Sequence, residues 1–162
     1  MKTEAEANRA LELYADTIRR ICFLHLKNMA DVEDVFQEVF LKYILCERLF
    51  ESDAHEKAWL IRVAVNQCRD VLKSFFRRNI YSLDDMELEP SCRIDDTGKE
   101  LLHAVLQLPD KYRDAIYLCY YEGYTAAEAA KLLQKRENTV YTWLTRGKKR
   151  LRELLGGDFT DA

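Results

Sequence analysis

Hydrophobic residues in the first part of the chain recur at intervals of three or four, the period of an amphipathic α-helix. The segment KNMAD interrupts this pattern, and we expect Asp31 to cap the helix that follows it. The pattern thus predicts a helix over residues 4–26 and a second one after it. We expect the first to bury Leu11, Tyr14, Ile18, Ile21, Cys22 and His25. We expect the second to bury Val32, Val35, Phe36, Val39, Phe40 and Tyr43.

A third helix is predicted after the segment CERLFESDAH, which has no apolar periodicity and is expected to form a loop. Asp53 and Glu56 have the spacing of a capping box. The helix should therefore begin near residue 54, and its pattern continues to about residue 78. Its expected core face consists of Ile61, Ala64, Cys68, Val71, Leu72 and Phe75.

The apolar periodicity stops between residues 79 and 100, where seven acidic residues stand against Arg93 and Lys99. Such a segment is typical of a linker. Beyond it, Pro109 suits a first helical turn, and Thr125 with Glu128 forms a second capping-box match. We expect four more helices there, at about 97–107, 109–122, 125–133 and 137–155.

The predicted fold is all-α, with two small helical domains joined by an acidic linker. The expected boundaries are 1–79 for the first domain, 80–97 for the linker, 98–156 for the second domain and 157–162 for a tail. The low content of turn-forming residues, five Gly and two Pro, agrees with a helical chain.

Composition excludes several classes of function. No run of about 18 uncharged apolar residues is present, and the charged N-terminus lacks the apolar core of a signal peptide. We therefore expect a cytoplasmic protein with no membrane insertion. The five cysteines include no CxxC pair, and no second pair completes the spacing of Cys22 and His25. We expect no metal, no cofactor and no catalytic site, and hence no enzyme.

Charge is concentrated locally, although the formal net charge is only −3. Residues 131–153 carry eight basic side chains against two acidic ones, a net of +6. Residues 57–78 carry six against one, a net of +5. Because nucleic-acid binding depends on the local field, these two segments are candidates for it.

The last predicted helix separates cleanly into two sides. Val140, Leu144, Gly147, Leu151, Leu154 and Leu155 are expected on the buried side. The short Ala-rich helix before it permits the close crossing of a helix-turn-helix, whose second helix enters the major groove of DNA. Base contacts are expected from Tyr141, Thr142, Thr145 and Arg146, and phosphate contacts from Lys148 and Lys149. The alternative is a solvated basic face.

The long third helix carries a polar stripe opposite its core face. The stripe consists of Trp59, Arg62, Asn66, Arg69, Lys73 and Arg77, which suits a phosphate backbone and one base. Alternatively, Trp59 packs at the edge of the core and the charges are merely solvated. On the preceding helix, Asp34, Gln37 and Glu38 form an acidic and amide patch that suits a protein partner or is a solvated face.

Taken together, three segments resemble a bacterial RNA polymerase sigma factor of the extracytoplasmic-function type. Residues 31–44 resemble that family's polymerase-binding helix. Residues 58–78 resemble its minus-ten helix, and residues 108–154 its fourth region. The three occur in the family's order and spacing.

The resemblance implies roles for individual residues. Asp34, Gln37 and Glu38 match positions that meet the clamp helices of the largest polymerase subunit. Asn66 matches a position that recognises a flipped minus-ten base, and Phe50 falls in the specificity loop that offers an aromatic ring to it. Four residues match minus-thirty-five contacts: Tyr141, Thr142, Thr145 and Arg146. The resemblance also implies binding to the flap of the second polymerase subunit, and an anti-sigma factor is a candidate further partner.

The sequence departs from the family in three places in this last region, one of which is Trp143, where the family often has Arg. The turn QKRE replaces the usual Gly and small N-cap residue, so Gln134 must make the turn and Arg136 or Glu137 must cap the helix. Gly147 replaces a small Ala, which allows close packing.

The function that these observations favour is transcription initiation: binding core RNA polymerase, directing it to specific promoters and helping to melt the minus-ten element. One alternative is a stand-alone helix-turn-helix transcriptional regulator. Another is an adaptor whose basic faces bind acidic partners.

Overall fold

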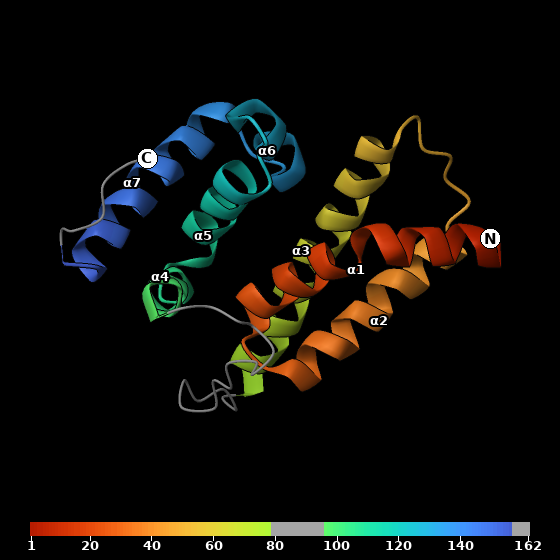
Figure 1. Cartoon of the computed structure of the whole chain (residues 1–162), viewed down its shortest axis with the longest axis horizontal. Coiled ribbons are helices and arrows are strands. Elements are labelled where there is room, and N and C mark those ends of the chain that lie inside the picture. The colour runs from red at the N-terminus through yellow and green to blue at the C-terminus, as the bar shows by residue number, and fades with distance from the viewer. Residues whose placement is uncertain (79–95, 157–162) are drawn as a thin grey trace. The chain divides into compact units, whose positions relative to one another are not determined.

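The structure is a computed structural model that describes the backbone of residues 1–78 and 96–156 (Figure 1). Side chains are described for residues 1–74 and 98–156. The chain divides into two compact units, Met1–Glu89 and Pro90–Ala162. Every regular element of the described residues is a helix, so the all-α prediction is confirmed. The predicted linker lies almost entirely outside the described residues, as does the predicted tail, and the predicted domain boundaries stay a prediction.

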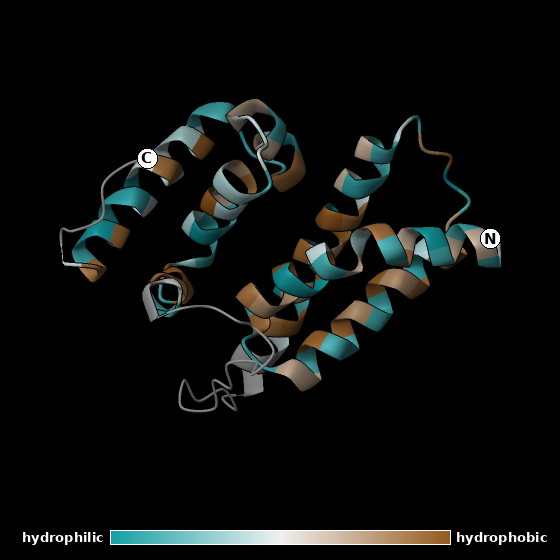
Figure 2. Ribbon diagram, in the orientation of Figure 1, coloured by the Kyte–Doolittle hydropathy of each residue, from teal (hydrophilic) through white to brown (hydrophobic). Residues whose placement is uncertain are grey.

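The first unit consists of α1 (Glu4–Leu26), α2 (Met29–Leu45) and α3 (Asp53–Arg78). Helix α1 packs against both of the others, and α2 also packs against α3. Figure 2 shows hydrophobic and hydrophilic residues on different sides of these helices. All six residues expected to be buried on α2 are buried. On α3 the predicted face is buried at Ile61, Ala64 and Cys68 and half-buried at Val71 and Leu72.

The turn between α1 and α2 is shorter than predicted. Lys27 ends α1 in the left-handed region with a φ of 59°. The side chain of Asn28 then caps α2, accepting hydrogen bonds from the backbone N–H groups of Ala30 at 2.9 Å and Asp31 at 3.3 Å. The prediction that Asp31 caps this helix was wrong, because a two-residue turn leaves Asp31 inside the first turn of α2.

The predicted capping box at the start of α3 was also wrong. Ser52 caps the helix: its hydroxyl oxygen accepts from His55 N–H at 3.1 Å, and its carbonyl accepts from Glu56 N–H at 3.0 Å. The carboxylates of Asp53 and Glu56 instead pair with Arg9 of α1. A cation supplied by a distant part of the chain therefore takes both groups away from the local capping role.

The second unit consists of α4 (Asp96–Leu106), α5 (Asp110–Ile116), the π-helix η2 (Tyr117–Tyr121), α6 (Ala126–Leu133) and α7 (Glu137–Leu154). Pro109 stands just before α5 with a ψ of 145°, outside the first helical turn in which it was expected. The single helix predicted over 109–122 changes to π geometry in its last part. The backbone N–H of Glu122 there bonds the carbonyl of Tyr117, five residues earlier, at 3.1 Å.

The capping box predicted for α6 is confirmed. Thr125 Oγ1 accepts from Glu128 N–H, and the Glu128 carboxylate accepts from Thr125 N–H, both at 3.1 Å. These hydrogen bonds hold the pKa of Glu128 below its usual range. The capping box thus fixes Thr125 as the residue before α6.

A small hydrophobic core joins α4, α5 and α7. Its buried members are Ala104, Leu108, Ile116 and Leu151, with Val105, Leu144 and Leu155 packed against them. Leu154 was expected on the buried side of α7, but 41% of its surface is exposed. Helix α7 ends at this residue, and it is Leu155 that packs against the core.

Gly147 is a position of close approach between α7 and α5. A Cβ atom placed there would lie 2.6 Å from Ile116 Cδ1 and 3.2 Å from Tyr112 Cβ. Carbon atoms do not approach so closely without displacement. The absence of a side chain at Gly147 therefore sets the spacing of α7 against α5, which is the close packing that the sequence suggested.

We expect Gly147→Leu to destabilise the second unit by about 2–3 kcal/mol, because the larger side chain separates α7 from α5. Gly147→Ala should change stability by less than about 1 kcal/mol, since its gain in helix propensity offsets a small shift of Ile116. Urea unfolding followed by Trp143 fluorescence, in a Trp59→Phe background, measures this. Lys149→Leu, on the exposed side of the same helix, is the matched control and should change little. Equal stability of Gly147→Leu and the control would contradict this packing.

Candidate nucleic-acid and partner interfaces

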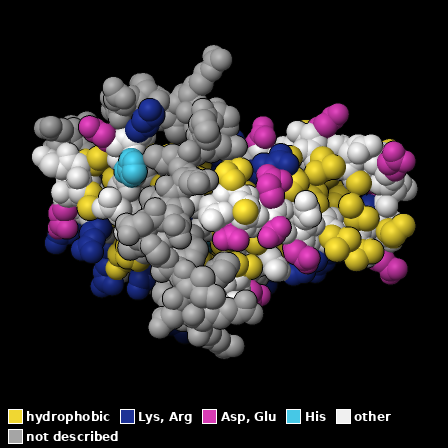
Figure 3. Space-filling view, turned by 90° about the horizontal axis from the view of Figure 1, so that it is seen from below, with side chains coloured by type: hydrophobic (Ala, Val, Ile, Leu, Met, Phe, Trp, Pro, Cys, Tyr) yellow, Lys and Arg dark blue, Asp and Glu magenta, His cyan; other side chains and the backbone are white. Residues whose placement is uncertain are grey.

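The outer side of α2 combines acidic, amide and apolar groups. Asp34, Gln37 and Glu38 are all exposed there. Leu41 and Leu45 extend the same side and are 49% and 58% exposed. A shallow depression lies along this surface, lined by Phe36, Gln37, Glu38, Phe40, Leu41 and Ile44. Figure 3 shows hydrophobic side chains bordered by acidic ones on this part of the first unit.

The apolar half of this surface was missed in the sequence. Leu41 and Leu45 stand four residues apart and lie off the buried stripe of α2, and this spacing is the signal that could have identified them. An apolar centre with a charged rim is the usual composition of a protein–protein contact. We call the surface formed by Asp34, Gln37, Glu38, Leu41 and Leu45 the α2 face.

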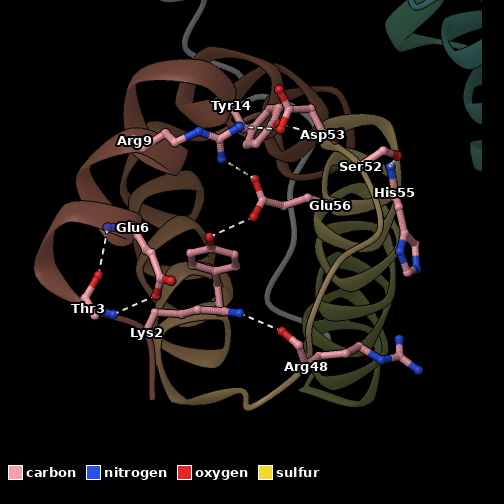
Figure 4. Close-up of polar contacts among 11 residues, drawn as sticks. Lys2, Thr3, Glu6, Arg9, Tyr14, Arg48, Ser52, Asp53, His55 and Glu56 are labelled. Atoms are coloured by element: carbon pink, nitrogen blue, oxygen red, sulfur yellow. Dashed lines mark hydrogen bonds and ion pairs between the residues drawn. The ribbon is translucent and has the colours of Figure 1, made fainter.

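A buried carboxylate connects all three helices of the first unit (Figure 4). Glu56 of α3 accepts a hydrogen bond from the Tyr43 hydroxyl of α2 at 2.9 Å and one from Arg9 of α1 at 3.1 Å. Arg9 also pairs with Asp53, whose backbone carbonyl accepts from the Tyr14 hydroxyl at 3.1 Å. Burial of the phenol, and then its hydrogen bond to Glu56, raises the pKa of Tyr43. Tyr43 therefore stays protonated and donates a hydrogen bond to the Glu56 carboxylate.

An aromatic cluster surrounds the ring of Tyr43. Phe50, from the loop between α2 and α3, stacks on it with a centroid distance of 6.3 Å and an interplanar angle of 12°. Trp59 of α3 lies 5.7 Å from Phe50 and 6.3 Å from Tyr43, and His55 meets Phe50 edge-on at 5.4 Å. Phe50 is half-buried, whereas its neighbour Leu49 is 90% exposed. The loop thus carries an exposed Leu49 next to the half-buried ring of Phe50. We call the rings of Phe50 and Trp59 the aromatic wall.

The polar stripe of α3 begins at this aromatic cluster. Arg62, Asn66 and Lys73 are exposed on α3, and Arg69 is half-buried. The side chain of Arg77 lies outside the described residues. Trp59 is itself half-buried, and its ring contacts show that it packs at the edge of the core as well as at the start of the stripe.

In the second unit, α6 and α7 form the expected helix-turn-helix. Gln134 makes the turn in the left-handed region with a φ of 56°. The N–H of Lys135 then bonds the carbonyl of Ala130 at 2.9 Å, which closes the end of α6. Arg136 is the N-cap of α7, and its side chain makes no capping hydrogen bond. Of the two cap residues left open by the sequence, the structure therefore assigns Arg136.

The outer side of α7 carries the expected base-contacting residues. Tyr141, Thr142, Thr145 and Arg146 are exposed, as is Lys149. Thr142 donates its hydroxyl hydrogen to the carbonyl of Asn138, and Thr145 donates to that of Tyr141, both at 3.0 Å. In this arrangement each Thr side chain offers a ligand its methyl group and the lone pairs of its hydroxyl oxygen, while the hydroxyl hydrogen is bonded within the helix. The exposed Asn138, one turn before Thr142, was missed in the sequence although it occupies the early part of the helix.

Lys148 differs from its neighbour Lys149. It is half-buried, and its ammonium group lies 4.7 Å from the ring centroid of Tyr120 in the π-helix. Tyr120 is 53% exposed, so the pair remains at the surface. The expected phosphate contact of Lys148 therefore competes with a cation–π contact, whereas Lys149 has no such constraint among the contacts described.

The described residues lack two further classes of feature. No helix there is long and apolar enough to cross a membrane. No group of three or more His, Cys, Asp or Glu side chains in the same residues is placed to bind a metal ion.

Comparison with protein families identifies both units. Residues 10–78 match the model of Sigma-70 region 2, and residues 98–151 match that of Sigma-70, region 4. The first range contains the α2 face and the stripe of α3, and the second contains the helix-turn-helix. A stand-alone helix-turn-helix regulator is therefore not favoured, because the first unit has a sigma-factor identity of its own.

Individual relatives agree with the family models. The RNA polymerase sigma factor CarQ of Myxococcus xanthus is 31% identical, over 81% of this chain and 78% of that protein. The ECF RNA polymerase sigma factor SigW of Bacillus subtilis is 26% identical, over 90% of this chain and 86% of that protein. The chain thus matches these relatives over most of their length as well as its own.

Solved structures share the fold. The sigma factor RpoE, crystallised with the anti-sigma factor NepR from Bartonella quintana, has a TM-score of 0.81 at 21% identity, covering 94% of this chain and 98% of that one. CnrH in complex with the cytosolic domain of CnrY has a TM-score of 0.71 at 19% identity, covering 97% and 92%. Together with the family models and relatives, this shows that the chain belongs to the RNA polymerase sigma factors of the extracytoplasmic-function type, which act with RNA polymerase and promoter DNA in transcription initiation.

Proposed function

We propose that three exposed surfaces of this chain each bind one partner of a sigma factor. The α2 face binds the clamp helices of the largest polymerase subunit. The stripe of α3 with the neighbouring loop binds the minus-ten element, and the outer side of α7 binds the minus-thirty-five element. The observation that carries this proposal is the placement of each surface: one acidic and two basic surfaces lie on helices whose opposite sides form the core of their unit.

The α2 face suits a protein partner better than DNA. Asp34 and Glu38 would repel phosphates, while Leu41 and Leu45 offer apolar area that gains from burial. A partner with apolar residues and basic groups around them complements both properties. The flap of the second polymerase subunit is the corresponding partner that we propose for the second unit.

The stripe of α3 supports melting by differential binding. Arg62 and Lys73 are exposed to hold a phosphate backbone, and the amide of Asn66 offers both a donor and an acceptor to a base edge. Flipping a base out of the stack requires a few kcal/mol, which an aromatic wall offsets through stacking. Phe50 supplies that wall together with Trp59, and Leu49 extends it toward solvent. Single-stranded DNA therefore binds this surface better than duplex DNA does.

The outer side of α7 supports recognition of duplex DNA in the major groove. The guanidinium of Arg146 can bond both acceptors of a guanine. Since the hydroxyl hydrogens of Thr142 and Thr145 are used within the helix, their methyl groups are the surfaces left for thymine methyls. Lys149 is free to approach a phosphate.

We further propose that an anti-sigma factor binds this chain. The support is that RpoE was crystallised with the anti-sigma factor NepR and that the CnrH structure contains the cytosolic domain of CnrY. The site of action is the cytoplasm, where polymerase and promoter DNA meet, and the proposed function makes or breaks no covalent bond.

Reversing the charge of Asp34 and Glu38 to Lys is expected to weaken binding to core polymerase about tenfold or more, because the α2 face loses its electrostatic complementarity. Co-elution and titration with core polymerase measure this. The matched control is Glu12→Lys with Asp16→Lys, an equal reversal on exposed positions of α1. If the double variant binds core polymerase as tightly as the wild type and keeps its helicity, the α2 face is not part of the interface.

Asn66→Ala is expected to change the preference at one base of the non-template strand, because the amide contacts a base edge. Lys73→Ala should weaken all sequences alike and reduce the slope of affinity against salt by about one unit. Both are measured as holoenzyme binding to a set of minus-ten variants at several salt concentrations. A uniform loss across base variants for Asn66→Ala would show that this residue touches backbone only.

Arg146→Ala is expected to lose roughly 1–3 kcal/mol of minus-thirty-five binding and to relax specificity at one position. Lys149→Ala, the control one turn further along the same helix, should weaken binding without changing base preference. A base-by-base scan of the minus-thirty-five element measures both. If the scan profile of Arg146→Ala equals that of the wild type, Arg146 contacts phosphate, and recognition belongs to Tyr141, Thr142 and Thr145.

A further inference from the structure

The residues just before α1 are attached to the loop between α2 and α3. The backbone N–H of Lys2 donates a hydrogen bond to the carbonyl of Ile44, at the end of α2, over 2.7 Å. Its ammonium group donates to the carbonyl of Arg48, in the middle of the loop, over 2.6 Å. Figure 4 shows the Lys2 side chain reaching across to Arg48. One residue therefore bonds both the end of α2 and the loop that follows it, at carbonyls that lie four residues apart.

The same ammonium group lies over the aromatic cluster. It is 5.0 Å from the ring centroid of Phe50 and 5.6 Å from that of Tyr43. Both distances lie within the range of a cation–π interaction. Lys2 thus contacts the ring that the loop offers as well as the backbone that carries the ring.

The backbone of Lys2 is itself held in place by its neighbour. Thr3 begins α1 with a complete capping box, in which Thr3 N–H bonds Glu6 at 2.9 Å and Glu6 N–H bonds Thr3 Oγ1 at 3.1 Å. Lys2 is therefore anchored to α1 on one side and to Ile44 of α2 on the other. Its side chain projects from a fixed base, which limits the entropy lost in holding the loop.

We infer that Lys2 is a positioning residue for minus-ten recognition. By bonding the Arg48 carbonyl and lying over Phe50, it sets the position of the loop that contributes Phe50 to the proposed surface for a flipped base, which we call the base pocket. This inference rests on the proposed role of the loop and of Phe50 in base binding. Lys2 acts through Phe50 and the neighbouring Leu49. Without its side chain, the loop samples other positions and the pocket discriminates less between bases.

A different role for Lys2 would be a general attraction for DNA phosphates. Arg48 allows the two roles to be separated, because it supplies only its backbone carbonyl to Lys2 and its side chain is exposed. Arg48→Ala removes one positive charge from the same loop and keeps the bond from Lys2. It is therefore the matched control for Lys2→Ala.

The test uses the full chain with core polymerase on a promoter library randomised across the minus-ten element. The measured quantity is the ratio of transcripts between the preferred base and the others at each position. Lys2→Ala is expected to reduce this ratio by about threefold or more at one position, since both a charge-assisted hydrogen bond and a cation–π contact are lost. Lys2→Arg should keep the ratio close to that of the wild type. Arg48→Ala should lower all transcripts and leave the ratio unchanged.

Thermal unfolding verifies that each variant folds, and Lys2→Met, which keeps the length of the side chain, replaces Lys2→Ala if that variant does not. An unchanged ratio in the folded variant overturns the inference, whatever the total transcript level. Phe50→Ala in the same library separates the two claims. If Phe50→Ala changes the ratio and Lys2→Ala does not, the inference alone is wrong. If neither changes it, the proposed base pocket is wrong as well.

Discussion

The buried carboxylate of Glu56 is the interaction on which the first unit depends. It lies on α3 and accepts hydrogen bonds from Tyr43 of α2 and Arg9 of α1, so one side chain connects three helices. A buried acceptor of this kind is destabilising unless it is satisfied, which makes the relative placement of the helices specific. Because Phe50 stacks on the Tyr43 ring, the same carboxylate also determines where the loop can present its aromatic wall. Core packing and the proposed base pocket thus share one group.

The surfaces that we propose for polymerase and for DNA differ in the sign of their charge. Its formal net charge of −3 conceals basic surfaces on α3 and α7 and an acidic one on α2. Acidic groups elsewhere in the chain weaken the attraction of the free protein for arbitrary DNA, since fields from both signs act at long range. In the function that we propose, polymerase binds the acidic α2 face, which lies on a different helix from either basic surface.

Periodicity predicted the helices and their buried sides well, since burial of one apolar stripe is what stabilises each helix. The complete buried set of α2 and the Thr125–Glu128 capping box followed from local spacing. Features that depend on distant residues did not follow. Asp53 and Glu56 match a capping box, yet Arg9 recruits both carboxylates. Most of the predicted site residues whose side chains are described are exposed, whereas Phe50, Trp59, Arg69 and Lys148 are half-buried. The contacts of Lys148 with Tyr120 and of Lys2 with Phe50 join segments that no local pattern relates.

Transcription by core polymerase, with and without the full chain, on a library randomised across both promoter elements tests the proposed function most directly. If the three surfaces act as proposed, transcripts depend on the chain and come from templates sharing two short elements, one at minus-thirty-five and one at minus-ten. The chain without polymerase then does not select the minus-ten element from duplex DNA. Selection of a single duplex element by the free chain, with no dependence of transcription on it, would contradict the proposed function.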